Sequence, residues 1–190
     1  MSQALEDLRE LKSNPDFEDR VAGEEYKYTT DKLEVVQINV GKVCNLACRH
    51  CHVEAGPART EVMDRKAMEA CLAVCREQKV ATIDITGGAP EMNPDFEWLV
   101  EEACKICGHV IVRTNLVILQ EEKYRHLPEF YADHRVEVVC SLPYYRAKEM
   151  NRVRGEGTFE KAIEVIRRLN ELGYGKEKDL VLNMVYNPAG

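Results

Sequence analysis

Short apolar runs alternate with amphipathic stretches along this chain from residue 34 onward. Runs of this kind, bounded by polar or turn residues, predict strands. They cover residues 34–40, 81–86, 109–114, 135–142 and 180–186. Strands that alternate with helices favour a parallel sheet with right-handed crossovers.

Helical periodicity fills the segments between these runs. Asp64 stands as an N-cap before a helix that reaches about residue 78. Asn93, followed by proline, predicts the start of a second helix that Gly108 ends. A weaker helical pattern falls within 120–132, and a clearer one spans 158–172. The whole pattern therefore predicts an α/β fold.

Residues 1–32 lack this alternation. Residues 3–12 predict a short charged helix, and Asn14-Pro15 ends it because proline disfavours helix at the preceding residue. Polar sequence without periodicity follows. We therefore expect an N-terminal appendage at 1–32 and an α/β core at 33–190.

Polar and reactive residues follow four of the predicted strands at the point where each ends. In parallel α/β sheets the carboxyl ends of the strands meet at one edge, where ligands bind. A cysteine loop follows the first strand, a glycine pair the second and a Thr-Asn pair the third, and a serine closes the fourth. These residues are Cys44, Cys48, Cys51, Gly87, Gly88, Thr114, Asn115 and Ser141.

Cys44, Cys48 and Cys51 are spaced to hold three corners of a cubane iron–sulfur cluster, which ordinarily takes four cysteines. The fourth iron would then be open to an external ligand. A structural zinc site completed by His50 or His52 explains the same thiols. A cluster that only carries electrons is a third alternative. Neither alternative explains the residues at the other strand ends.

Composition narrows the class of protein. The 190 residues are 45% hydrophobic and 31% charged, which is typical of a soluble globular domain, and the net charge of −7 argues against nucleic acid or an anionic membrane as main partner. No apolar run approaches the roughly 20 residues of a membrane span, and the acidic N-terminus lacks the apolar segment of a secretory signal. We therefore expect a cytoplasmic protein whose eight cysteines bind metal, catalyse or pack in the core.

The cysteine loop and the glycine loop, in this order and on these elements, resemble the radical S-adenosylmethionine (radical SAM) superfamily. The glycine loop covers Gly87, Gly88, Ala89, Pro90 and Glu91. The resemblance implies that the three cysteines bind a [4Fe-4S] cluster, that S-adenosylmethionine binds the open iron, and that the glycine loop meets its amino group. It also implies a partial (β/α)6 TIM-like barrel, here truncated after the fifth strand. An electron from the reduced cluster then cleaves S-adenosylmethionine to a 5′-deoxyadenosyl radical.

Two positions depart from the pattern of this superfamily. Ala89 stands where a glutamate is usual, although Glu91 lies nearby. His50 stands where an aromatic residue commonly packs near adenine, and an imidazole can stack on a base or hydrogen-bond to it.

Three stretches resemble one branch, the arsenosugar-biosynthesis radical enzymes. They include ACRHCHVEAGP at 47–57, TGGAPEMNP at 86–94 and RTNL at 113–116, and the resemblance covers about 35–190. The implied reaction is that of a transferase, which moves a 5′-deoxyadenosyl group to a trivalent methylated arsenical and forms a carbon–arsenic bond. The implied partners are this small-molecule substrate and a reducing electron donor such as a flavodoxin or ferredoxin.

By analogy with the family, Thr114, Asn115 and Ser141 are candidates for hydrogen bonds to the ribose or carboxylate of S-adenosylmethionine. The alternative is that they cap strand ends and turns. Arg154 lies in the basic stretch 146–154, and its planar guanidinium suits the same carboxylate. The alternative for this stretch is a solvated loop.

The remaining cysteines divide into two groups. Cys140, beside Ser141, would suit a soft arsenic centre as a substrate thiol, unless its side chain points into helix packing. The others lie on the apolar faces of predicted helices, where core packing is the expected role. They are Cys71, Cys75, Cys104 and Cys107.

Overall fold

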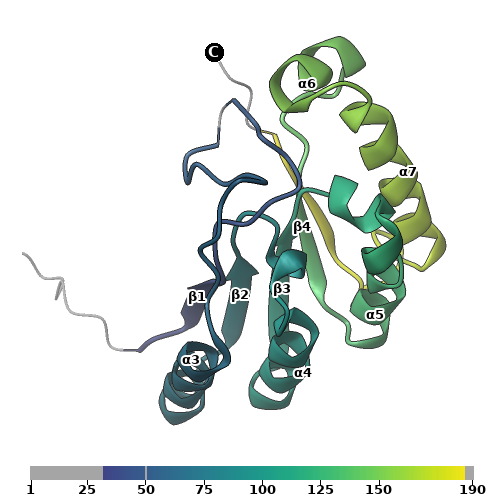
Figure 1. Ribbon diagram of the computed structural model, residues 1–190. Coiled ribbons are helices and arrows are strands. Elements are labelled where there is room, and N and C mark those ends of the chain that lie inside the picture. Colours follow the sequence, from purple (N-terminus) through teal and green to yellow (C-terminus); the bar gives the residue numbers. More distant parts are fainter. Residues whose placement is uncertain (1–31, 50, 187–190) are drawn as a thin grey trace, which may run out of the picture. The chain divides into compact units, whose positions relative to one another are not determined.

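The structure is a computed structural model that describes residues 32–49 and 51–186 (Figure 1). The chain divides after Lys32, and the elements below belong to the unit of residues 33–190. The short helix predicted at 3–12 lies outside the described residues, and so does His50.

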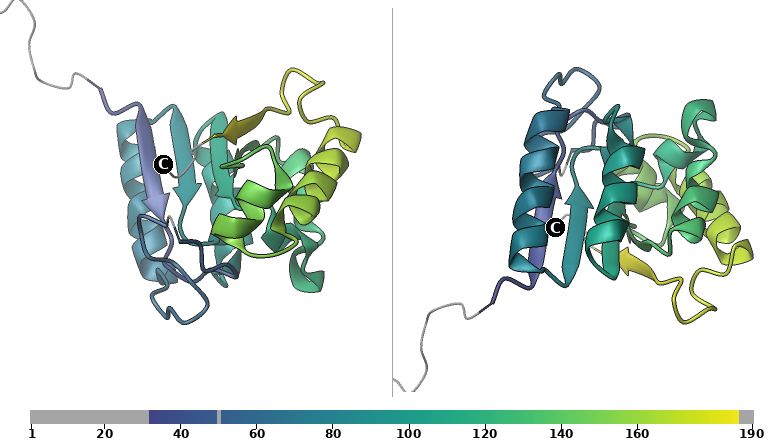
Figure 2. Two further views of the ribbon diagram at one scale, coloured as in Figure 1. Left: turned by 90° about the horizontal axis from the view of Figure 1, so that it is seen from above. Right: turned by 90° about the horizontal axis from the view of Figure 1, so that it is seen from below.

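Five parallel strands form one sheet, and they correspond to the five apolar runs of the sequence. They are β1 (Val35–Asn39), β2 (Thr82–Thr86), β3 (His109–Thr114), β4 (Glu137–Ser141) and β5 (Leu182–Val185). The order in the sheet follows the order in the chain, and every neighbouring pair is parallel. Successive right-handed crossovers place the helices on one face and leave the other face open, as in a barrel wall (Figures 1 and 2). The predicted α/β architecture is confirmed.

Helices and 3-10 turns connect the strands. They are α3 (Arg65–Gln78), η2 (Pro90–Met92), α4 (Phe96–Ile106), η3 (Val117–Gln120), η4 (Glu122–Tyr124), α5 (Leu127–Asp133), α6 (Ala147–Arg154) and α7 (Thr158–Glu171). Asp64 caps α3 as predicted, because its Oδ1 accepts from the backbone nitrogen of Ala67 at 2.8 Å. Two 3-10 turns and the short α5 replace the weaker helix predicted within 120–132. The basic stretch forms α6 rather than a solvated loop, since Met150 and Val153 are buried.

The second predicted helix begins at Phe96, and not after an N-cap at Asn93. The Asn93 side chain instead donates from Nδ2 to the carbonyls of Val40 and Met63, each at 3.0 Å. Its Oδ1 accepts from the backbone nitrogen of Asp95 at 2.9 Å. Buried carbonyls need such donors. The Asn93 side chain therefore links the two ends of the segment between β1 and α3 instead of capping α4.

The side of the sheet that faces the helices is apolar. Its buried residues include Ile38, Ile83, Ile85, Val110, Val112 and Val138, in one core with Met68, Leu99 and Val165 of the helices. Cys75 and Cys107 are buried in this core, and Cys71 and Cys104 pack against it. These four thiols are therefore packing residues, as predicted.

Candidate functional site

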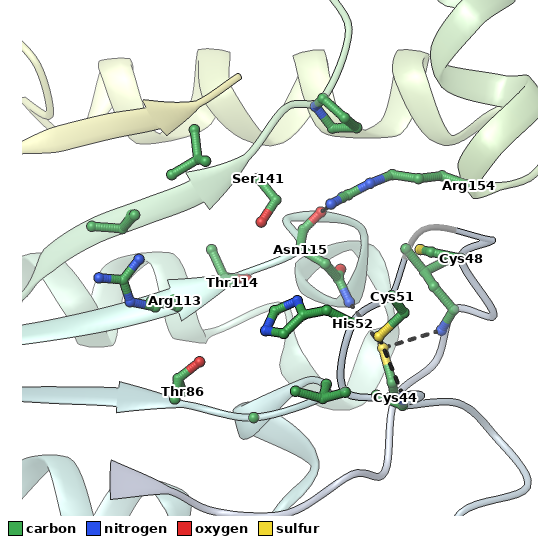
Figure 3. A pocket seen from close by; sticks show the side chains of 18 residues that line it. Cys44, Cys48, Cys51, His52, Thr86, Arg113, Thr114, Asn115, Ser141 and Arg154 are labelled. Carbon is green, nitrogen blue, oxygen red and sulfur yellow. Dashed lines mark hydrogen bonds between the residues drawn. The ribbon is translucent and has the colours of Figure 1, made fainter. Parts of the chain in front are cut away.

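A pocket of about 250 Å³ opens at the carboxyl edge of the sheet (Figure 3). The loop after β1 brings Cys44, Cys48 and Cys51 to this pocket. Segments at the ends of β2, β3 and β4 and the end of α6 supply other walls. The residues predicted from the sequence that line these walls are Gly87, Gly88, Thr114, Asn115, Ser141 and Arg154. The predicted meeting of four strand ends is thus present in the structure.

N–H groups contact two of the three sulfur atoms. Cys44 Sγ accepts from the backbone nitrogen of Leu46 at 3.5 Å and from Asn115 Nδ2 at 3.6 Å. Cys51 Sγ accepts from the backbone nitrogen of Ala55 at 3.3 Å. Donors of this kind stabilise negative charge on the sulfur atoms of iron–sulfur clusters and tune their potentials.

The three thiols are candidates to hold a cluster. Burial raises the pKa of the Cys44 and Cys48 thiols, so their thiolate forms need a positive centre nearby. In the described residues no group of three or more His, Cys, Asp or Glu side chains is close enough to hold one metal ion. A zinc ion needs ligand atoms about 2.0–2.3 Å away, and the three thiols and His52 are not gathered around one such point. Three cysteines line the described pocket wall, which suits a cubane with one open iron.

Two backbone hydrogen bonds join the glycine loop to the cysteine loop. Gly88 donates to the carbonyl of Gly41, and Ala89 donates to the carbonyl of Val43, each at 2.9 Å. A Cβ atom on Gly88 would lie 2.5 Å from the Val43 oxygen and 2.9 Å from Ala55 Cβ. The two loops can approach this closely only because residue 88 is glycine.

Gly88→Ala should therefore displace the cysteine loop. We expect the free energy of unfolding to fall by about 1–3 kcal/mol, as for other overpacked sites, and less iron to be retained after anaerobic reconstitution. Urea denaturation and iron analysis measure the two effects. Gly108→Ala is the matched control, since a Cβ atom at Gly108 meets nothing within 4 Å. Equal iron content in both variants would contradict this role of Gly88.

The rest of the glycine loop turns away from the pocket. Ala89, Pro90 and Glu91 are buried and do not line the pocket wall, because η2 carries them toward the core. Tyr131 Oη donates to Glu91 Oε1 at 3.1 Å, and Glu91 Oε2 has no hydrogen-bond partner among the described residues. The structure thus does not bring the side chains of these three predicted cofactor-binding residues to the site.

Glu91→Gln should stabilise the protein at and above neutral pH. Burial raises the pKa of Glu91 from 4.5 to about 7, although the hydroxyls of Thr114 and Tyr131 oppose this rise. Because the folded chain holds this proton more tightly than the unfolded chain, the free energy of unfolding falls as pH increases from about 4.5 to 7 and then levels off. The upward shift of the Glu91 pKa corresponds to a loss of about 3 kcal/mol in the free energy of unfolding.

Urea midpoints at pH 5 and pH 8 measure this effect. The wild type should lose more stability between the two pH values than Glu91→Gln does. Glu101→Gln removes an exposed carboxyl and should follow the wild type. Parallel profiles for wild type and Glu91→Gln would show that the burial of Glu91 does not govern this pH dependence.

Thr114 and Asn115 use their polar atoms within the protein. Asn115 Nδ2 donates to Asn45 Oδ1 at 2.8 Å, and its Oδ1 accepts from the backbone nitrogen of Ile118 at 3.0 Å. Thr114 Oγ1 accepts from the backbone nitrogen of Leu116 at 3.2 Å. Both residues line the pocket, and these contacts match the capping alternative for them.

Neighbouring residues at the end of β4 face opposite sides of the sheet. Ser141 and Val139 line the pocket, whereas Cys140 is fully buried on the helix side, as the alternation of strand side chains requires. Burial raises the pKa of the Cys140 thiol to about 11, so it is not a thiolate near neutral pH. The structure therefore places Cys140 in helix packing and not at the pocket as a substrate thiol.

Arg154 is a buried cation without a carboxylate partner in the described part of the chain. Only 8% of the residue is exposed, and its Nε makes no hydrogen bond there. Its Nη1 reaches the carbonyl of Asn115 at 3.5 Å. Burial lowers the pKa of Arg154, and the thiols of Cys48 and Cys44 oppose this effect. Because a buried unpaired charge is costly, the pocket favours an anion beside this guanidinium.

Several residues that line the pocket were not predicted from the sequence. They are Leu46, Thr86, Arg113, Val139, Pro143 and Val185. Arg113 lies inside the apolar run of β3, where it interrupts the pattern. Side chains of a strand alternate between the two faces of the sheet. Because Val112 is buried against the helices, this alternation places Arg113 on the open face.

The sequence model of the Radical SAM superfamily matches residues 38–188. The chain therefore belongs to the radical SAM superfamily, a family of enzymes that use a [4Fe-4S] cluster and S-adenosylmethionine. The three thiols and their N–H donors fit this cluster. No helix in the described part of the chain is long and apolar enough to cross a lipid bilayer.

Particular relatives resemble the chain over part of their length. The mycofactocin maturase MftC of Mycobacterium ulcerans is 27% identical over 164 residues, which are 86% of this chain and 44% of that protein. The antilisterial bacteriocin subtilosin biosynthesis protein AlbA of Bacillus subtilis is 25% identical over 131 residues, 68% of this chain and 29% of that protein. The chain thus spans less than half the length of these curated relatives.

Solved structures share the fold. Streptococcus suis SuiB, bound to the precursor peptide SuiA, matches 97% of this chain and 38% of its own with a TM-score of 0.66. The two sequences are 18% identical, so this likeness concerns the fold alone. It agrees with the open, parallel α/β sheet described above.

Proposed function

We propose that this chain cleaves S-adenosylmethionine reductively and transfers the 5′-deoxyadenosyl group to a trivalent methylated arsenical. The observation that carries the proposal is the convergence of three thiols and one buried unpaired guanidinium on a single pocket. His52, Val53 and Ala55 line the same pocket. They belong to the stretch 47–57 that resembles the arsenosugar enzymes, and this supports the choice of acceptor.

The residues of the chain bind and orient the reactants in this proposal. Cys44, Cys48 and Cys51 hold the cluster, which when bound supplies the electron that cleaves the C5′–S bond of S-adenosylmethionine. Arg154 pairs with the carboxylate of S-adenosylmethionine, because a guanidinium and a carboxylate form charge-assisted hydrogen bonds. Ser141 offers its hydroxyl to the ribose.

The loops position these groups. Backbone carbonyls at Gly87 and Gly88 receive the ammonium group, which the absence of side chains there allows to approach. Asn115 acts as a positioning residue, because its amide holds Asn45 and the sulfur of Cys44 in the cysteine loop.

The bonds and electrons of the overall transfer balance without an added oxidant. The C5′–S bond breaks, a C5′–As bond forms, and arsenic passes from the trivalent to the pentavalent state. Methionine and the proton of the arsenic hydroxyl are released. The electron that starts the cleavage is returned when the product forms, so a donor such as a flavodoxin or ferredoxin supplies it catalytically. The eight free cysteines suit the reducing cytoplasm where such donors act.

The experiment uses the full chain after anaerobic reconstitution with iron and sulfide. Dithionite, S-adenosylmethionine and dimethylarsinous acid are added, and mass spectrometry follows arsenic-containing products and 5′-deoxyadenosine. We expect an arsenical that carries the deoxyadenosyl group. Formation of 5′-deoxyadenosine without this adduct would exclude the arsenical acceptor. Absence of both products would exclude activity of this chain.

A peptide acceptor is the second candidate function. The observation that favours it is the similarity to MftC and to the bacteriocin biosynthesis protein AlbA. Abstraction of a hydrogen atom from a peptide would transfer deuterium from a deuterated peptide digest into 5′-deoxyadenosine. Deuterium incorporation would favour this candidate, and unlabelled 5′-deoxyadenosine would argue against it.

A further inference from the structure

The open face of the sheet carries many polar side chains beside the apolar Val35, Ile111, Val139 and Val185, whereas the side that faces the helices is apolar. The polar side chains of the open face include Gln37, Thr82, Asp84, His109, Arg113, Glu137 and Asn183. A parallel sheet that is covered by apolar layers on both faces carries apolar residues at both alternating positions. The polar part of the open face is therefore not an uncovered part of the hydrophobic core, and it suits a small molecule that carries polar groups.

The row of polar side chains farther from the pocket is satisfied by its own contacts. His109 Nδ1 lies 3.0 Å from Thr82 Oγ1, and His109 Nε2 lies 2.7 Å from Glu137 Oε2. Asn183 Nδ2 donates to Glu137 Oε1 at 2.7 Å. Each of these polar side chains has a hydrogen-bond partner within the protein, so the row needs no ligand to satisfy it.

The row nearer the pocket holds one guanidinium in a fixed position. Arg113 donates from Nε to both oxygens of Asp84, at 2.9 and 3.0 Å, and from Nη2 to Oδ2 at 2.8 Å. Gln37 Nε2 donates to the same carboxylate at 2.8 Å. The Asp84 side chain is only 6% exposed, whereas that of Arg113 is 41% exposed. No hydrogen bond within the described residues uses Nη1 of Arg113, so this edge of the guanidinium is open.

The surroundings of Arg113 complete a small binding wall. Arg113 lines the pocket together with the hydroxyl-bearing Thr86 and Ser141 and the apolar Val139. Figure 3 shows Arg113 on the side of the pocket away from the cysteines, while Arg154 lies on their side. The two cations therefore serve different parts of the pocket.

We infer that Arg113 binds an anionic oxygen, an oxyanion or a carboxylate, of the acceptor substrate. Asp84 and Gln37 hold the guanidinium in place before binding, so little side-chain entropy is lost when the acceptor arrives. In the trivalent methylated arsenical the bound group is the oxygen attached to arsenic, which becomes an anion when its hydroxyl loses the proton that the transfer releases. The inference depends on the proposed function in one respect, namely that the acceptor enters this pocket.

The test measures binding of dimethylarsinate at pH 8 to the reconstituted full chain with S-adenosylmethionine, by isothermal titration. This oxyanion has no lone pair on arsenic and does not accept the transferred group. Arg113→Gln should weaken its binding about 10- to 100-fold, because a charge-assisted hydrogen bond is lost. The affinity for S-adenosylmethionine should not change. Arg168→Gln is the matched control, since it breaks a two-nitrogen ion pair with Glu129 on helices α7 and α5.

Two further variants separate binding from folding. Asp84→Asn keeps a side-chain oxygen that can accept from Arg113 and removes the negative charge that competes with the ligand, so it should keep or tighten dimethylarsinate binding. A purely structural pair would instead make Asp84→Asn and Arg113→Gln equally harmful. The double variant Asp84→Asn/Arg113→Gln removes both charges without leaving a buried carboxylate unpaired, and it should bind as weakly as Arg113→Gln. Wild-type affinity in Arg113→Gln or in the double variant would overturn the inference.

The outcome also separates this inference from the proposed function. Binding that depends on Arg113, without any arsenical product in the turnover assay, would remove the arsenical as acceptor and leave the anion site. An arsenical product with dimethylarsinate binding independent of Arg113 would remove the anion site and leave the transfer reaction.

Discussion

Cys48→Ser should abolish both cluster assembly and S-adenosylmethionine cleavage. In the proposed site Cys44, Cys48 and Cys51 would hold the cluster through their thiolates, and a serine hydroxyl is a poor ligand for iron in such a cluster. We expect the brown colour, the stoichiometric iron and sulfide, and the formation of 5′-deoxyadenosine all to be lost after anaerobic reconstitution. Because Cys48 is half-buried and lies outside the core cluster, the unfolding free energy of the apo chain should change by less than about 1 kcal/mol.

Cys71→Ser is the control for this experiment. Cys71 is also half-buried, but it lies on α3 and does not line the pocket. Its replacement should leave iron content and 5′-deoxyadenosine formation at the wild-type level. If Cys48→Ser retained a [4Fe-4S] signal in electron paramagnetic resonance while Cys71→Ser lost it, the assignment of the ligands would be wrong.

Arg154→Gln should have opposite effects on binding and on stability. The guanidinium is buried and lacks a carboxylate partner among the described residues, so its removal should raise the unfolding free energy of the apo chain by about 1 kcal/mol. The same change removes the proposed partner of the S-adenosylmethionine carboxylate. We expect affinity for S-adenosylmethionine to fall at least about 10-fold, measured by anaerobic equilibrium dialysis on the reconstituted chain.

Arg152→Gln is the matched variant on the same helix. Arg152 is exposed, so this replacement lowers the positive charge of α6 equally without touching the pocket. It should leave both the affinity for S-adenosylmethionine and the unfolding free energy close to wild type. Equal affinity in Arg154→Gln and Arg152→Gln would show that Arg154 does not bind the carboxylate.

The elements whose positions were predicted correctly depend on local patterns. The five strands follow from short apolar runs, and the start of α3 follows from the side chain of Asp64. The meeting of the cysteine and glycine loops follows from the rule that parallel strands end at one edge. The start of α4 was misplaced because Asn93 bonds to Val40 and Met63, which lie far from it in the sequence.

The candidate residues differ in how much their sequence context reveals. Ser141 reached the pocket and Cys140 did not, although they are neighbours. The run 135–142 does not show which of its alternating positions faces the helices. Arg154 is buried because α6 packs Met150 and Val153 into the protein. A basic stretch alone does not reveal this packing. The alternation within β3 could have placed Arg113 on the open face, but its pairing with Asp84 could not be predicted because Asp84 lies on another strand.

Short segments of the sequence suffice to predict the class of protein, because the spacing of Cys44, Cys48 and Cys51 and the glycine pair after the second strand are local features. Which side chains share the pocket, and which charges lack partners, depends on the fold. Burial and pairing arise between residues from different elements. Arg113 against Asp84 and Arg154 beside the thiols are such contacts, and no local pattern contains them.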